Sequence, residues 1–360
     1  MNIGFQTLCK CSIMLLVFWL GACEVPSPPT IESSSSTAQI TEKKTSLILV
    51  SAYTMPASEG RLSEKFAFTS NHRMWSRGSS DSKSNQMMFS DNFGKSWTFV
   101  DLPNRSSAPG SVLFIDQRNG WAMDAFEALS TTDGGMTWNE TPLPSNHKMA
   151  ELNAIEFTDP KRGYVAGSTS YLERGFGILH LGIEIICTQN GGKTWSICYK
   201  DHVNDKVRKM VSLGNLTMAL VDQKTLLMTS DGGKTWTQKH WEFPATDIEA
   251  VADGVLWTTG EDGFLRSSSD LGDTWKIVSL PKPESREFRW TSISFDTKGL
   301  GAAVGSDGAI AFTTDMGRSW ELRSKEKSNE NLDLWTVRVQ KPYIAILTKN
   351  TLYVFRVDGD

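Results

Sequence analysis

The sequence of 360 residues lacks a long run of basic residues, and its formal net charge is −4. A protein that binds nucleic acid needs clustered positive charge to replace the counterions along the phosphate backbone. We therefore expect no nucleic-acid partner. Long apolar segments are also absent apart from residues 13–20, and this run is too short to cross a bilayer as a stable helix.

Histidine and cysteine are scarce, with five residues of each. The histidines do not have the spacing of metal ligands. The aspartates that lie beside glycines lack the acidic run and the closing glutamate of a calcium loop. We therefore predict no metal, no cofactor and no catalytic residue.

Residues 1–22 have the pattern of an export signal, because Lys10 precedes the apolar run and the small residues Gly21 and Ala22 follow it. The stretch LGAC, which ends at Cys23, resembles the lipobox of bacterial lipoproteins. This resemblance implies cleavage before Cys23 and lipidation of its thiol. An ordinary secretory signal or a short anchor is the alternative.

Residues 23–45 are rich in proline and serine and show no apolar periodicity, which is typical of a flexible tether. In bacterial lipoproteins, a glutamate such as Glu24 after the lipidated cysteine, in place of aspartate, implies sorting to the outer membrane if the host is Gram-negative. We therefore expect a lipid-anchored protein of the bacterial cell envelope, with its folded domain at residues 46–360.

An eight-residue box with the pattern Ser/Thr-x-Asp/Asn-x-Gly-x-Ser/Thr-Trp occurs six times. Its tryptophans are 41, 57, 41, 39 and 45 residues apart, which is the period of a propeller blade with four short strands. Alternating β-branched or aromatic runs lie upstream, so each unit is predicted to contain strands A, B and C, the box, and strand D. The acidic or amide residue and the tryptophan of the six boxes are Asn92 and Trp97, Asp133 and Trp138, Asn190 and Trp195, Asp231 and Trp236, Asp270 and Trp275, and Asp315 and Trp320.

The residue types of the box fit a turn between strands C and D. The acidic or amide side chain and the hydroxyl residue before it accept hydrogen bonds from nearby main-chain N–H groups. The glycine supplies a positive φ, and the tryptophan covers the hairpin with a large apolar face. A catalytic loop is needed once and a turn in every blade, so the box is predicted to be structural.

The 40 residues after Trp320 contain three predicted strands and no box. Residues 46–53 have strand character without a partner of their own, so we expect them to supply the outer strand of that last sheet. Such pairing hides the edges that an open array exposes. The predicted fold is all-β, a seven-bladed β-propeller closed by pairing of its N- and C-terminal strands, with six or eight blades as alternatives.

Two cysteines, Cys187 and Cys198, lie beyond the predicted leader and lipid site. Cys187 directly precedes the third box, and Cys198 follows the tryptophan of that box by three residues. If the box is a hairpin, the two side chains face each other across strands C and D. We expect a disulfide there, with unlinked buried thiols as the alternative.

The boxes resemble the Asp-box, or BNR, repeats of sialidase-like and sortilin-like propellers. The stretch FTDPKRGYVAG at residues 157–167, followed by TQNGGKTW, is more similar to the propellers of the photosystem II stability and assembly factors. This resemblance implies a seven-bladed fold and, among cyanobacterial members, a lipoprotein. Motifs of this kind specify a fold and leave the function open.

A sialidase-like enzyme or a glycan-binding module is the first alternative function. Resemblance to sialidases implies three arginines that hold the substrate carboxylate, a tyrosine activated by a glutamate, and an acidic aspartate. The R-I-P motif of the first arginine is absent, and Arg61, Arg73 and Arg77 lack its context. Tyr171 and Glu173 are close in sequence, but in a segment expected to be a surface loop. An envelope protein that neutralises a toxin is the second alternative.

In a four-stranded blade the AB and CD turns share one face, and the BC turns and the connections between blades emerge on the other. All boxes therefore lie on one face, and a partner is expected on the opposite one. Blade 3 carries extra residues at 168–182. Variable loops of this kind often carry recognition, although they can also be merely variable. The predicted partner contacts are Tyr171, Arg174, Phe176, Arg286, Arg289 and Trp290.

Together these features predict a non-catalytic scaffold that binds or assembles proteins at the cell envelope or membrane. Its expected partners are the membrane, through the lipid, and a protein of the envelope. A glycan ligand stays open.

Overall fold

The computed structural model describes residues 45–54, 66–69, 72–80, 83–102, 109–123, 127–147, 149–172, 179–202, 206–278, 280, 288–323 and 333–358. They belong to one compact unit, residues 44–360. The predicted leader, Cys23 and the tether up to residue 44 lie outside the described residues. So do three of the predicted partner contacts, Arg174, Phe176 and Arg286.

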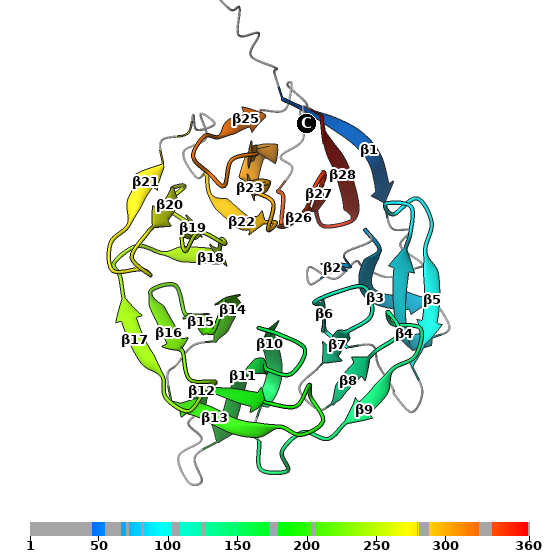
Figure 1. Cartoon of the computed structure of the whole chain (residues 1–360), viewed down its shortest axis with the longest axis vertical. Helices are drawn as coiled ribbons and strands as arrows, with labels where there is room; N and C mark the ends of the chain where they lie inside the picture. Colours follow the sequence, from blue (N-terminus) through cyan, green and yellow to red (C-terminus); the bar gives the residue numbers. More distant parts are fainter. Residues whose placement is uncertain are drawn as a thin grey trace, which may run out of the picture. The chain divides into compact units, whose positions relative to one another are not determined.

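The described strands form seven sheets of four strands each, arranged around a central axis like the blades of a propeller (Figure 1). Blade 1 contains β2 (Ala67–Phe68), β3 (Met74–Ser80), β4 (Lys83–Ser90) and β5 (Thr98–Asp101). Blade 2 contains β6 (Ser111–Phe114), β7 (Gly120–Met123), β8 (Ala128–Thr131) and β9 (Asn139–Thr141). Blade 3 contains β10 (Met149–Phe157), β11 (Gly163–Leu172), β12 (Leu179–Thr188) and β13 (Ser196–Asp201).

The next three blades follow the same order from the axis outward. Blade 4 contains β14 (Val207–Leu213), β15 (Leu216–Val221), β16 (Thr225–Thr229) and β17 (Thr237–His240). Blade 5 contains β18 (Ala245–Ala250), β19 (Leu256–Gly260), β20 (Leu265–Ser268) and β21 (Lys276–Val278). Blade 6 contains β22 (Trp290–Phe295), β23 (Gly301–Gly305), the 3-10 helix η2 (Ser306–Gly308), β24 (Ile310–Thr313) and β25 (Glu321–Arg323). In the part of the chain that the structure describes, no helix is long and apolar enough to cross a membrane.

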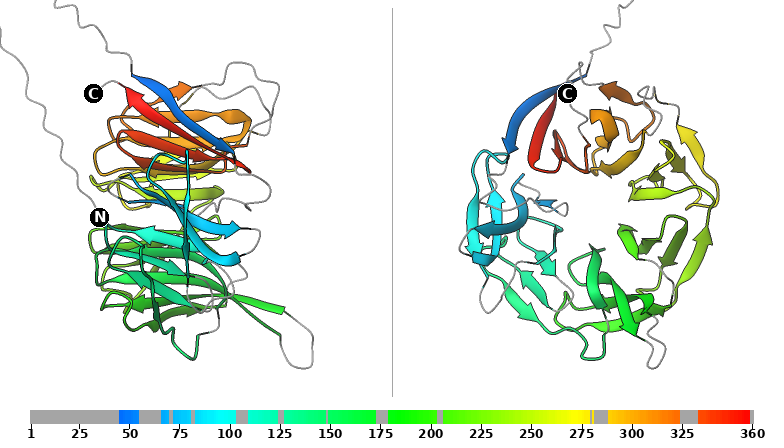
Figure 2. Two further views of the ribbon diagram at one scale, coloured as in Figure 1. Left: turned by 90° about the vertical axis from the view of Figure 1, so that its right-hand side faces the viewer. Right: turned by 180° about the vertical axis from the view of Figure 1, so that it is seen from behind.

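Blade 7 combines both ends of the described chain. Its strands are β26 (Thr336–Gln340), β27 (Tyr343–Leu347), β28 (Thr351–Asp358) and, from the other end, β1 (Ser46–Thr54). β1 lies outermost and pairs with β28 in antiparallel register, from Ser46 opposite Asp358 to Thr54 opposite Thr351 (Figure 2). The predicted all-β, seven-bladed propeller closed by its terminal strands is confirmed.

The core is divided among the interfaces between neighbouring blades. Every residue of β7, β19 and β23 is buried, because these middle strands are covered on both faces by the adjacent sheets. Seven clusters of buried side chains result, one at each interface. Each blade is therefore stabilised by its two neighbours, which makes the closed ring the unit of stability.

The six boxes form the turns between the third and fourth strands of blades 1 to 6. In blade 2, the N–H of Gly135 donates to Thr131 Oγ1 at 2.9 Å. The N–H and the hydroxyl of Thr137 donate to the two carboxylate oxygens of Asp133, at 3.0 and 2.6 Å. Slight burial raises the pKa of Asp133, but the hydrogen bonds from Thr137 and Thr131 outweigh it and lower the pKa to about 2. The box aspartate is thus an ionised acceptor that holds its own turn.

The boxes lie beside the turns that join the first two strands of each blade. In blade 2 the N–H of Gly134 donates to the carbonyl of Arg118 at 2.9 Å, and in blade 3 the N–H of Gly191 donates to the carbonyl of Lys161 at 2.8 Å. AB turns and boxes therefore share one face of the ring. The BC turns and the connections between blades lie on the other face.

The box tryptophans pack between blades, a role beyond covering their own hairpin. Trp138 of blade 2 lies edge-on to Trp75 of blade 1, with ring centroids 6.1 Å apart. A Cβ atom on Gly135 would lie 2.4 Å from Trp75 Cζ2, so that glycine is required for space as well as for its φ of +87°. Trp257 of blade 5 and the box tryptophan Trp320 of blade 6 have the same arrangement, with ring centroids 5.3 Å apart.

Blade 3 departs from the other blades at its two middle strands. β11 and β12 have 10 residues each, against 4 in β7 and β8, and they project beyond the ring as a hairpin (green in Figure 2). Their pairing continues as far as Leu172 opposite Leu179. The same blade holds a disulfide between Cys187 and Cys198, whose Cα atoms are 5.9 Å apart.

Candidate functional site

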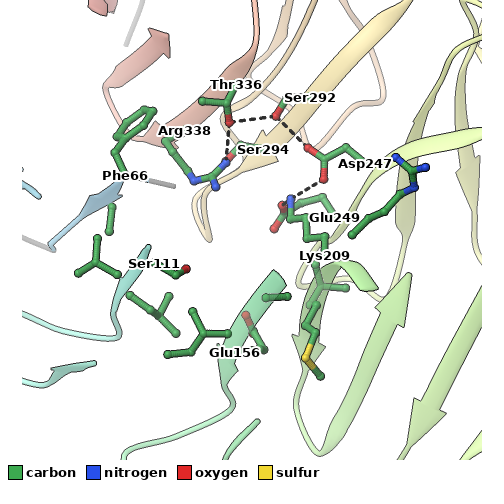
Figure 3. Close-up of a pocket in the computed structure, with 18 of the residues that line it drawn as sticks. Phe66, Ser111, Glu156, Lys209, Asp247, Glu249, Ser292, Ser294, Thr336 and Arg338 are labelled. Carbon is green, nitrogen blue, oxygen red and sulfur yellow. Dashed lines mark hydrogen bonds and ion pairs between the residues drawn. The ribbon is translucent and has the colours of Figure 1, made fainter. Parts of the chain in front are cut away.

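The centre of the ring is a cavity of about 520 Å³ lined from every blade. Its lining comes from the innermost strands, β2, β6, β10, β14, β18, β22 and β26, and from residues next to them (Figure 3). Because these strands come from the whole length of the domain, residues far apart in the sequence become neighbours there. A concave site with convergent polar groups is the usual place for a ligand.

Asp247 links blade 5 to blades 4 and 6 at the wall of this cavity. One carboxylate oxygen accepts the N–H of Ile248 at 2.9 Å and lies 3.0 Å from Lys209 Nζ. The other accepts the hydroxyl of Ser292 at 2.8 Å and the N–H of Ile293 at 3.0 Å. With four donors around its two oxygens, Asp247 holds strands together and has little capacity left for a ligand.

Lys209 of β14 lies between two carboxylates of the next blade. Its Nζ is 2.6 Å from Glu249 Oε2 and 3.0 Å from Asp247 Oδ1. Burial lowers the pKa of the ammonium group, but the charges of Asp247 and Glu249 outweigh it and raise the pKa. Removal from water raises the pKa of Glu249, and Lys209 offsets only part of that rise. Lys209 is therefore a cation at neutral pH, held in place by its acidic neighbours.

Glu156 of β10 faces the same part of the cavity (Figure 3). Removal from water and the charge of Glu249 raise its pKa to about 8, although a hydrogen bond from Ser212 and the charge of Lys209 act in the opposite direction. The Glu156 carboxyl group is therefore mostly protonated at neutral pH. It gains a negative charge as the pH rises through 8.

Two arginines also line the cavity, Arg208 and Arg338. Arg338 donates a hydrogen bond to Thr336 Oγ1 at 3.2 Å, and its guanidinium carbon is 5.8 Å from the centre of the Phe66 ring. Arg208 Nε donates to the carbonyl of Asp222 at 2.8 Å. Each guanidinium group thus makes a hydrogen bond to its own surroundings.

The described lining of the cavity differs from a sialidase-like site. It includes Arg208 and Arg338 but no tyrosine. Arg73 pairs with Asp91 at 2.6 Å, and neither Arg73 nor Arg77 lines the cavity. Over the described ranges, no three His, Cys, Asp or Glu side chains are grouped so that they could hold a metal ion.

The predicted partner contacts that the structure describes do not form one site. Tyr171 lies near the end of β11. The Arg289 side chain is 53% exposed beside blade 6, and its guanidinium group is 3.9 Å from Asp333. The prediction for Trp290 is wrong, because this side chain is 1% exposed and packs with Phe288 in the core between blades 5 and 6. A tryptophan at the start of an innermost strand is a core residue here.

Sequence reasoning missed the charged residues of the cavity, Glu156, Lys209, Glu249 and Arg338. A signal was present, since each is a charged residue within a strand of apolar and β-branched residues, such as NAIEF and TVRVQ. Alternation of polar and apolar residues normally means that the polar ones face solvent. Only the closure of the ring makes these positions face one another.

The family described as photosynthesis system II assembly factor YCF48 matches residues 89–237. Two curated relatives are named photosystem II assembly lipoprotein Ycf48. The one from Synechococcus sp. (strain CC9902) is 22% identical over 188 residues, which are 50% of this chain and 52% of that protein. The one from Picosynechococcus sp. is 27% identical over 183 residues, 49% of this chain and 50% of that protein. The chain thus spans about half the length of the curated relatives it matches.

Solved structures match over most of the chain. YCF48 bound to a D1 peptide has a TM-score of 0.62 at 18% identity and covers 86% of this chain and 97% of its own. YCF48 from Cyanidioschyzon merolae has a TM-score of 0.60 at 15% identity, covering 86% and 98%. A virginiamycin B lyase from Staphylococcus aureus has a TM-score of 0.60 at 10% identity, covering 87% and 99%. At these identities the likeness shows the fold alone.

Seven closed blades and six boxes define the class of this protein, an Asp-box β-propeller. Within that class, the family match and the relatives confirm the resemblance found in the sequence. Over about half of its length, the chain is similar to the photosystem II assembly factor propellers.

Proposed function

We propose that this protein is a non-catalytic scaffold that binds or assembles other proteins at the cell envelope. The observation that carries the proposal is the likeness to propellers named as assembly factors, one of which was solved with a peptide bound. A rigid ring of blades presents loops for recognition and needs no catalytic group to do so. Assembly of membrane or envelope proteins is the role this combination supports.

The face opposite the boxes is the proposed binding face. On the box face, acceptors such as the Asp133 carboxylate are used by their own turn. β11 and β12 are the second and third strands of blade 3, so the turn that joins them is a BC turn. Their projecting hairpin therefore extends from the face opposite the boxes. The connection that carries Arg289 into blade 6 emerges on that same face.

Deleting residues 170–180 tests this site. We expect the variant to lose its partner in a crosslinking pull-down from native envelopes, because the hairpin projects beyond the core. Its melting temperature should change by only a few degrees, since the pairing of β11 with β12 from Gly163 opposite Thr188 to Thr169 opposite Gly182 is kept. Met136→Ser, on an exposed side chain of the box face, is the matched control and should retain the partner. If the deletion variant still captured the partner protein, the binding site would have to lie outside residues 170–180.

The membrane anchor is proposed to be a lipid on Cys23, exposed after removal of residues 1–22 and joined to the propeller by the tether of residues 23–45. The lipoprotein names of the relatives support this proposal. In a Gram-negative host, Glu24 favours the outer membrane.

Cys23→Ala should release the protein from the membrane fraction, because the variant has no thiol to lipidate. Cys11→Ala is the control, since that cysteine would leave with the signal, and this variant should stay in the membrane fraction. Immunoblotting of fractionated cells measures both. If Cys23→Ala stayed with the membranes, the lipid anchor would be rejected.

A further inference from the structure

The outermost strand of blade 7 differs from the outermost strands of the other blades. β1 has 9 residues and begins Ser-Leu-Ile-Leu-Val, whereas β9, β21 and β25 have 3 residues each and β17 has the polar sequence Thr-Gln-Lys-His. Four large apolar side chains are exposed among the described residues, and two of them, Ile48 and Leu49, are adjacent on β1, at 40% and 50% exposure. The other two, Met136 and Ile277, lie singly in blades 2 and 5.

Ile48 and Leu49 lie on the two sides of a free strand edge. β1 pairs with β28 on one side and is the last strand of its sheet, so its other edge faces outward at the rim of the ring (Figure 1). Neighbouring residues of a strand point to opposite faces of the sheet. Because both side chains are exposed, neither face of the strand is fully covered by an adjacent blade at this point. A flat surface that meets the rim edge-on therefore contacts both side chains.

The place of β1 in the chain indicates what that surface is. The tether of residues 23–45 runs from the proposed lipid on Cys23 directly into β1, which begins at Ser46. Along the chain, β1 is therefore the strand nearest the anchor, and a tethered segment has a high effective concentration at the surface to which it is tethered. Apolar side chains at this position add to the contact that the lipid makes, and membrane proteins commonly combine a lipid with a second membrane contact.

We propose that the outer edge of β1 lies in the interface of the lipid bilayer, with the side chains of Ile48 and Leu49 at the boundary between headgroups and acyl chains. The inference rests on the lipid anchor of the proposed function. The unpaired backbone groups of the free edge need water, so the contact is shallow and the backbone stays among the headgroups. The ring then stands on its rim, and the face opposite the boxes is turned sideways, toward proteins of the same membrane.

The charged side chains described beside this edge are of both signs, so the apolar pair is the main contact with the bilayer. Arg356 of β28 lies opposite Ile48, and its guanidinium group is 3.6 Å from Asp358. Arg323 of β25 donates to the carbonyl of Leu47 at 3.0 Å, and the same strand carries an exposed glutamate. Vesicles of a lipid without net charge should therefore be sufficient for the contact, and added salt should not weaken it.

Fluorescence of the lipidated full-length protein in phosphatidylcholine vesicles tests the proposal. A polarity-sensitive fluorophore is attached to the new thiol of Ile48→Cys or Leu49→Cys, and Ile277→Cys, on an exposed residue of β21, is the matched control. We expect blue-shifted emission at positions 48 and 49. Lipids with a doxyl group near the headgroup should quench it several-fold more strongly there than at position 277. Quenching at neither β1 position, at one alone, or equally at all three positions would overturn the proposal.

Flotation of the same vesicles separates this inference from the proposed function. If the unmodified protein floats and Cys23→Ala does not, the lipid anchor stands, and unquenched labels then reject the contact of β1 alone. If the unmodified protein does not float, the anchor fails and the inference fails with it.

The same labels distinguish the bilayer from a second copy of the chain at this edge. In Cys23→Ala without vesicles, emission at position 48 that shifts to the blue as the protein concentration rises would identify a second copy as the occupant and overturn the proposal. A pull-down that captures no partner protein would reject the scaffold role and would not affect the contact of β1 with the bilayer.

Discussion

Single residues of the boxes are interchangeable where their hydrogen bonds are the same. Asp133 and Asn190 each accept the N–H of the fourth residue after them at 3.0 Å. Asn190 Nδ2 donates to the hydroxyl of Thr194 at 2.8 Å, whereas Asp133 Oδ2 accepts the hydroxyl of Thr137 at 2.6 Å. The hydroxyl reverses its role as donor or acceptor, so the turn requires an acceptor and a hydroxyl group rather than a charge.

The box glycines are less tolerant than the acidic positions. Gly135→Ala should cost about 3 kcal/mol or more in the free energy of unfolding, because a positive φ and a collision with Trp75 combine. Gly254 has a φ of +88°, and a Cβ atom added to it would meet no other atom within 4 Å, so Gly254→Ala should cost only about 1 kcal/mol. Urea unfolding of both variants measures the difference. Equal costs would mean that the contact with Trp75 adds nothing.

Individual elements were predictable because the same unit recurs. The box predicted the turn between the third and fourth strands of six blades. The last three strands lacked a fourth partner, and residues 46–53 were the one unpaired predicted strand that could supply it. The pairing of β1 with β28 follows from that count. The packing of Trp138 against Trp75 of the preceding blade could not be predicted, because it depends on which faces of two sheets meet.

The disulfide links two neighbouring strands of one blade, β12 and β13. It lies against the next blade, because a Cβ atom on Gly233 would be 2.6 Å from Cys187 Sγ. Mass spectrometry of unreduced peptides should recover Cys187 linked to Cys198. Replacing both cysteines by serine should lower the free energy of unfolding by about 3 kcal/mol, through the chain entropy of a short loop. Free thiols at both positions, or an undiminished unfolding free energy, would contradict this prediction.

At the scale of the whole molecule, the ring has two opposite faces and a central cavity. The two faces were predictable, because alternating strand direction alone determines which turns share a face. The cavity was not, because Glu156, Lys209 and Glu249 meet only when blades 3, 4 and 5 are placed around one axis. Trp290 was misjudged for the same reason, since an aromatic residue near a loop can equally begin an innermost strand in the core.

Crosslinking mass spectrometry in native envelopes tests the central claim, that this propeller is a protein-binding scaffold acting from the face opposite its boxes. Exposed lysines mark both faces. Lys206 and Lys224 lie at a connection between blades and at a BC turn, whereas Lys95, Lys193 and Lys234 lie in boxes. We predict that a partner protein is crosslinked mainly through Lys206 and Lys224. Crosslinks confined to the box lysines, or the recovery of no partner protein, would contradict the account.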